Sequence, residues 1–173
     1  SSATYLKLTG TRGEILDCNG NVLAGNRSVY NAIYSRLSGS NETRNAVVLE
    51  AVKLLETLNV PWTDLLPIEI KSGKYQFKTK MTAEIETLKS EDVLDLPSSA
   101  TADECMESLI ERYDLEAYTS PEDFRRIASV RYGMERAYFS RTNPFVLAKD
   151  ISIETVELLS ERSTDLPGIE TQV

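Results

Sequence analysis

The segment spanning residues 12–24 constrains the fold more than any other part of this chain. Two short runs, Glu14–Leu16 and Val22–Ala24, flank an Asn19-Gly20 pair. A tight hairpin turn needs positive φ angles at its centre, and Asn and Gly adopt them most readily. The segment therefore predicts a β-hairpin. Because an isolated two-stranded hairpin is only marginally stable in water, we expect both ends of the chain to meet in space.

Further β signals lie towards both ends, with one more hairpin between them. Residues 28–36 are rich in Tyr, Val and Ile, which favour strands. Residues 67–78 alternate around a Ser72-Gly73 turn and predict a second hairpin. Towards the C-terminus we expect a strand or extended return over residues 136–141, a short apolar piece at 146–148 and an extended tail at 169–173.

Helical patterns fill most of the region between. Apolar residues at spacings of three or four predict a helix over residues 42–59, with a proline after it as the stop. Thr101 and Glu104 form a capping box at the start of another helix, and Ser120-Pro121 opens the next. We expect further helices at residues 82–89 and 152–163.

These elements predict an α+β fold rather than an alternating β-α-β one. Residues 1–38 and 139–173 are expected to form a small antiparallel β pedestal. Residues 39–138 are expected to form a mainly helical insertion that contains one β-hairpin.

Charge and composition exclude several classes of function. The 173-residue chain carries a formal net charge of −8, with a pI near 4.7. Binding nucleic acid requires clustered Lys and Arg that displace counterions from phosphates, so we expect no nucleic-acid partner. The sequence shows no apolar run of about 18 residues that would span a membrane, and we expect no signal peptide within it.

The chain has no His, and its two cysteines, Cys18 and Cys105, lack the spacing of metal ligands. We therefore expect no zinc site, no His-based catalytic triad and no cofactor. The cysteines fit a pair of small, partly buried thiols. A disulfide between them in an oxidising compartment stays open, because the sequence does not give their separation.

Residues 12–24 also resemble a known motif. They follow the pattern Arg-Gly-x-Ile-x-Asp-Arg-Asn-Gly-x-x-Leu-Ala, which lies near the membrane in class B penicillin-binding proteins. Cys18 is the one departure and stands where that family usually has Arg. The matching residues that we single out as a structural motif are Arg12, Gly13, Asp17, Asn19 and Gly20.

The resemblance continues downstream in the same order and covers most of the chain. Residues 101–113 and 125–132, which include Arg131, are similar to the helical insertion of Gram-positive class B enzymes. Residues 144–155 and the Leu166-Pro167-Gly168-Ile169 step are similar to the return segment. We add Arg131, Pro167 and Gly168 to the structural motif. The similarity is weakest from about Val60 to Leu96.

The resemblance implies a non-catalytic N-terminal pedestal, often called the dimerisation domain. In that family the pedestal holds a transpeptidase domain away from the membrane and contacts proteins of the cell-wall machinery. The implied partners are the protein's own transpeptidase domain, other cell-wall synthesis or division proteins, and a second copy in a homodimer. The implied location is the extracytoplasmic face of the cell membrane, through an anchor upstream of Ser1.

The catalytic motifs of the same family are missing from this sequence. No Ser is followed by Lys three residues on or by Asn two residues on, and Lys78-Thr79-Lys80 lacks the Gly of a Lys-Thr-Gly motif. We therefore expect penicillin to acylate the parent D,D-transpeptidase but not this chain. The acidic pairs at residues 84/86 and 91/92 suit acid–base chemistry in principle, but in a chain with 27 acidic residues they indicate a solvated surface.

Several charged residues have both a structural and a functional interpretation. Arg125, Arg126 and Arg131 form either helix-surface salt bridges or a small anion patch. Arg12 and Asp17 either lock the hairpin, by pairing with each other or with the backbone, or contact the catalytic domain. If they are structural, Arg12→Ala and Asp17→Ala lower the melting temperature of this domain. An unchanged melting temperature favours contact with the catalytic domain.

Two other classes of function remain as alternatives. The first is a stand-alone extracellular module that reuses the pedestal fold to bind a carbohydrate or peptide, which a concave cluster of exposed aromatic residues would favour. The eight Tyr are scattered along the sequence, which disfavours it. The second is an unrelated cytoplasmic helical adaptor, which the acidic composition permits and the ordered motif matches disfavour.

Overall fold

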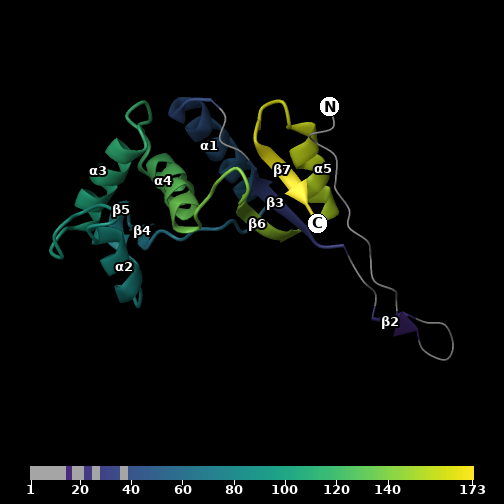
Figure 1. The fold of residues 1–173 in the computed structure, drawn as a ribbon, viewed down its shortest axis with the longest axis horizontal. Helices are drawn as coiled ribbons and strands as arrows, with labels where there is room; N and C mark the ends of the chain where they lie inside the picture. The colour runs from purple at the N-terminus through teal and green to yellow at the C-terminus, as the bar shows by residue number, and fades with distance from the viewer. Residues whose placement is uncertain (1–14, 17–21, 25–27, 36–38) are drawn as a thin grey trace.

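A three-stranded antiparallel sheet joins segments from distant parts of the chain. The computed structural model of the protein describes residues 15–16, 22–24, 28–35 and 39–173. The central strand is β3 (Tyr30–Tyr34), which lies between β6 (Phe145–Ile151) and β7 (Ile169–Gln172). Tyr34 pairs with Phe145 on one side and with Ile169 on the other. The predicted α+β fold, with a small sheet built from both ends of the chain, is confirmed (Figure 1).

The N-terminal hairpin predicted around Asn19-Gly20 is present as two short strands. β1 (Ile15–Leu16) pairs antiparallel with β2 (Val22–Ala24), and Ile15 lies opposite Ala24. The turn residues between the two strands lie outside the described residues.

Each long helix begins at a side-chain cap that the sequence indicates. The capping box predicted at Thr101 and Glu104 is present, and Ser40, Ser120 and Ser152 cap three other helices. These starts are fixed locally, because each cap binds an amide that the first helical turn leaves unpaired. The helices are α1 (Asn41–Thr57), α2 (Thr82–Lys89), α3 (Ala102–Arg112), α4 (Pro121–Arg136) and α5 (Ile153–Glu161).

The strands of the sheet differ in length from their predictions. β3 is shorter than the strand predicted over residues 28–36, and β6 is longer than the apolar piece predicted at residues 146–148. Ala32, Ile33 and Tyr34 are all buried, so the central strand is covered on both faces. α5 packs against β3 and β7. Burial on both faces explains why the apolar residues of β3 do not simply alternate.

The prediction of a strand or extended return over residues 136–141 is wrong. α4 continues to Arg136 and closes with a Schellman turn, in which the Phe139 amide donates a 2.9 Å hydrogen bond to the Met134 carbonyl. Tyr138 has a φ of +54°, the left-handed conformation that this turn requires and that Gly usually supplies. Because a Tyr takes that position, the sequence lacks the usual signal for the end of a helix.

The helical insertion packs around its own hairpin. β4 (Ile68–Lys71) pairs with β5 (Lys74–Phe77) around the predicted Ser72-Gly73 turn. α3 packs against β5 and α4, and α4 packs against α1. Figure 1 shows the hairpin, α2 and α3 at one end of the molecule and the β3 sheet with α5 towards the other, with α1 and α4 between them.

One hydrophobic core runs through both parts. It extends from Leu88 of α2 to Ile169 of β7 without a break between the insertion and the sheet. The division into a pedestal of residues 1–38 and 139–173 and an insertion of residues 39–138 stays a prediction. Within the part of the chain that the structure describes, no helix is long and apolar enough to cross a bilayer.

Candidate interaction surface

The structure places only some of the predicted motif residues. Arg12, Gly13, Asp17, Asn19 and Gly20 lie outside the described residues, as does Cys18, so their roles stay predictions. The strands on either side of them are paired as described above.

Pro167 and Gly168 lie at the turn that leads into β7. Gly168 has a φ of +96°, which side chains with a Cβ rarely adopt. Its carbonyl accepts hydrogen bonds from the Ser35 amide (2.8 Å) and the Ser35 hydroxyl (3.3 Å). The turn thereby ties the start of β7 to the end of β3, which is a structural contact.

Arg131 lies at the centre of a polar network that links α1, α4 and the end of α3. Its Nη1 and Nη2 atoms donate to the side-chain oxygens of Asn45 (2.7 Å) and Asn41 (3.1 Å). The guanidinium carbon lies 5.1 Å from the centre of the Tyr113 ring, and Asn45 donates to the Tyr113 carbonyl (2.8 Å). Burial lowers the pKa of the Arg131 guanidinium, and the positive charge of Arg44 lowers it further.

The other two arginines of the predicted anion patch are paired with carboxylates. Arg125 Nη1 lies 2.9 Å from Asp64 Oδ2. Arg126 lies between Glu56 of α1, at 3.0 Å, and Asp123 of its own helix, at 2.8 Å. The salt-bridge interpretation is therefore confirmed for these two residues. Arg131 differs, because none of the described carboxylates forms an ion pair with it.

Asp64 anchors the segment before β4 to α4. Its carboxylate accepts hydrogen bonds from Arg125 and from the Ser129 hydroxyl, while Arg125 Nε donates to the Ile68 carbonyl. Burial alone would raise the pKa of Asp64, but Arg125, with smaller contributions from Ser129 and Lys78, holds it below its ordinary value. These contacts lie within the domain and fasten two of its segments together.

Arg44 of α1 is a candidate that sequence reasoning missed. Its Nε atom is buried and has no hydrogen-bond partner, and in the described part of the chain it forms no ion pair. Together with Arg131 it lines a surface hollow of about 270 Å³. No spacing rule brings these two arginines together, because they belong to different helices. The remaining lining residues, which with the two arginines we call the two-arginine hollow, are Met134, Glu135, Tyr138 and Phe139.

The single carboxylate that lines the two-arginine hollow already has a partner. Glu135 accepts two hydrogen bonds from Arg112, at 3.1 Å from Nε and 3.0 Å from Nη2. Such a two-point pair has the geometry in which a guanidinium and a carboxylate satisfy each other. Among the described residues, Arg44 and Arg131 are therefore left without an ion pair in this hollow. The negative charge of Glu135 only partly offsets the lowering of the Arg131 pKa.

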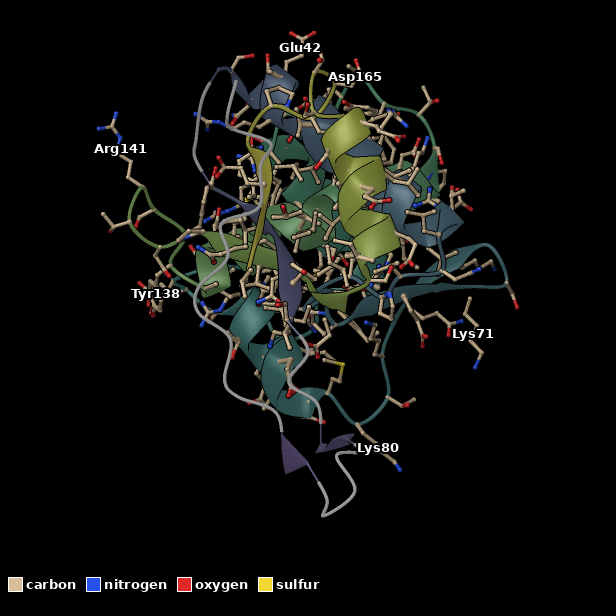
Figure 2. The ribbon with its side chains drawn as sticks, turned by 90° about the vertical axis from the view of Figure 1, so that its right-hand side faces the viewer. Glu42, Lys71, Lys80, Tyr138, Arg141 and Asp165 are labelled. Atoms are coloured by element: carbon tan, nitrogen blue, oxygen red, sulfur yellow. The ribbon has the colours of Figure 1, made fainter. Side chains whose placement is uncertain are left out.

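Tyr138 projects from the rim of the hollow. Its side chain is 79% exposed, and Figure 2 shows it pointing outward on the same side of the molecule as Arg141. The backbone beneath it is held by Asn143, whose side-chain amide donates to the carbonyls of Ala137 (2.9 Å) and Tyr138 (3.1 Å). The aromatic ring is thus presented to solvent from a fixed turn.

The described residues hold no group of three His, Cys, Asp or Glu side chains that can bind a metal ion. Cys105 is a buried free thiol, and burial raises its pKa, which keeps it protonated and unreactive. The acidic pairs at residues 84/86 and 91/92 are exposed to solvent, in agreement with a solvated surface.

Comparison with known protein families gives a match over nearly the whole chain. Residues 7–173 match the model of the family described as the penicillin-binding protein dimerisation domain. The match includes the N-terminal hairpin, the helical insertion and the β3 sheet. No curated protein matches the chain at a significant level.

Proposed function

Because this chain belongs to the family of penicillin-binding protein dimerisation domains, we propose that it is the pedestal that positions the transpeptidase domain of such a protein. The domain itself is non-catalytic. In this role it contacts partner proteins of peptidoglycan synthesis at the extracytoplasmic face of a cell membrane, to which a segment upstream of Ser1 anchors it.

The family match over residues 7–173 is the observation that carries this proposal. The sheet supports it, because β3 follows the N-terminal hairpin directly and pairs along its length with the C-terminal strand β7. A domain that follows β7 would therefore be joined to a strand that is hydrogen-bonded into the sheet. The hydrophobic core continues from this sheet into the insertion, so the two parts are packed together and can support a neighbouring domain as one unit.

Labelling with fluorescent penicillin tests the proposal. An antibody raised against this domain identifies the natural protein in cell membranes, where its size and labelling are measured beside the purified domain. We expect a protein much larger than 19.3 kDa that stays with the membrane fraction and is labelled, whereas the purified domain is not. The unlabelled domain is the matched control, because it lacks the Ser-x-x-Lys nucleophile.

A natural protein of about the size of this domain that never labels would overturn the proposal. The stand-alone extracellular binding module would then become the leading interpretation. Protease treatment of intact cells separately tests the location, because an extracytoplasmic domain is digested while the cell envelope still protects cytoplasmic proteins.

A further inference from the structure

We propose that the two-arginine hollow binds a carboxylate side chain from an acidic segment of a partner protein. The inference rests on the proposed function in one respect, which is that the domain has protein partners. It adds the place of contact and the chemistry of the partner.

The uncompensated charge in the hollow is the first argument. Arg44 and Arg131 lie close enough for the charge of one to affect the other, and among the described residues neither forms an ion pair with a carboxylate. The negative charge of Glu135 also acts on Arg131, but less strongly than the positive charge of Arg44, and Glu135 is held by Arg112. Burying a charge without a counterion is costly, and the cost is relieved when an anion arrives. The hollow is thus a local positive site on a protein whose formal net charge is −8.

The free hydrogen-bonding capacity of Arg44 is the second argument. Arg131 already donates from Nη1 and Nη2 to two asparagine oxygens. Its contribution to an incoming anion is therefore mainly its positive charge rather than free hydrogen-bond donors. The Nε atom of Arg44 has no acceptor and is shielded from solvent, so a carboxylate reaches it once the side chain turns into the hollow that Arg44 lines. A guanidinium presents its donors as a planar fork that fits the two oxygens of a carboxylate. We therefore assign Arg44 as the binding residue and Arg131 as the residue that raises the local potential.

The rim indicates a protein partner rather than a small molecule. Tyr138, 79% exposed, stands beside the arginines, and Met134 and Phe139 line the hollow next to it. Exposed Tyr together with Arg is the composition that dominates binding energy at protein interfaces. Because the Schellman turn and Asn143 already fix the backbone at Tyr138, little backbone entropy is lost when a partner packs against the ring.

A titration followed by NMR tests this inference on the purified domain. The probe is an end-capped hexapeptide of alternating Glu and Asp, and the matched control peptide carries Gln and Asn in their place. For one carboxylate contact we expect a Kd on the order of 1 mM. The acidic peptide should shift the Nε–H resonance of Arg44, and the neutral peptide should leave it in place.

The variants separate this site from general attraction of acidic peptides. Arg44→Gln should weaken binding of the acidic hexapeptide at least tenfold, and Arg44→Lys should restore part of the affinity. Arg141→Gln removes an exposed arginine on the same side of the molecule and should leave the Kd within twofold. The backbone amide spectrum of each variant shows that it is folded.

Four results would overturn the proposal. These are an absence of saturable binding, equal effects of Arg44→Gln and Arg141→Gln, displacement of the peptide by an equal concentration of inorganic phosphate, and an Arg44 resonance that moves with protein concentration when no peptide is present. The third would assign the hollow to phosphate groups, and the fourth to a second copy of this chain. None of them affects the penicillin-labelling test, so failure of this inference is distinguishable from failure of the proposed function.

Discussion

Three arginines of α4 are partly buried, and two of them, Arg125 and Arg131, lie within two helical turns of each other and are used in opposite ways. Arg125 meets the carboxylate of Asp64, so its charge is compensated inside the domain. Arg131 contacts two amide oxygens and an aromatic ring, so no ion pair with a described residue compensates its charge. The first arginine fastens the segment before β4 to the helix. The second, beside Arg44, gives the surface a positive site.

The comparison teaches that hydrogen bonding and charge compensation are separate properties. Both guanidiniums have acceptors, and both contact segments far away in the sequence. Only an ion pair leaves a stranded charge when one partner is removed, and that stranded charge is what makes such removal costly. The changes in the free energy of unfolding that mutations cause at the two sites should therefore differ in size, in pH dependence and even in sign.

The largest expected effect is at Asp64. Asp64→Asn keeps the shape of the side chain but leaves the Arg125 guanidinium, 12% exposed, without its counterion. We expect the free energy of unfolding to fall by about 3 kcal/mol, measured by urea denaturation. Asp165→Asn, at an exposed pair with Arg162, is the control and should change it by less than about 0.5 kcal/mol. Equal effects of the two substitutions would contradict a compensated buried pair.

The advantage of wild type over Asp64→Asn should depend on pH. The folded-state pKa of Asp64 lies below the ordinary value of 3.8, so its stabilising effect is fully present above that value. As the pH falls, the unfolded chain takes up the proton first, and the advantage is lost through the folded-state pKa. In urea denaturation we expect the difference between the two proteins to shrink from about pH 5 to pH 3. A difference that is constant over this range would show that the charge of Asp64 does not cause it.

Arg131→Met should cost less than Arg125→Met. The first substitution removes hydrogen bonds to neutral oxygens together with an uncompensated charge, so we expect a loss of about 1 kcal/mol. The second strands the charge of Asp64 and should cost about 3 kcal/mol. Urea denaturation of both variants at neutral pH makes the comparison. Equal losses would show that the charge of Arg131 is compensated in solution, with Glu135 as the group to test next.

The smallest expected effect has the opposite sign. Arg44→Gln removes a positive charge next to Arg131, so we expect the free energy of unfolding to rise by about 0.3 kcal/mol. The gain should decrease at high salt, because ions screen partly exposed charges. Thermal unfolding at low and high salt, with Arg141→Gln as the neutral control, is the measurement. A loss of stability would mean that Arg44 makes a favourable contact in the free domain.

Much of the local structure was predictable, and one helix end was not. The caps at Thr101, Ser120 and Ser152 and the turn at Ser72-Gly73 depend on residues within a few positions of one another, so the sequence signals them directly. The end of α4 was missed because Tyr138 takes a conformation that is usually left to Gly. The tertiary contacts of Phe139 with Tyr34 accompany that turn, and no local pattern encodes them.

The sequence by itself determined the α+β class, the order of the elements, the lack of family catalytic motifs and the family resemblance, because these depend on residue types and their spacing. The sequence did not distinguish Arg125, Arg126 and Arg131 from one another, because each fitted either a salt bridge on the helix surface or an anion patch. Only the tertiary structure decided between them, since a counterion is supplied by whichever segment packs against the helix. That packing places Asp64 against Arg125 and Glu56 against Arg126. It surrounds Arg131 with two neutral oxygens, the Tyr113 ring and the positive charge of Arg44, with Glu135 acting on it more weakly and without an ion pair.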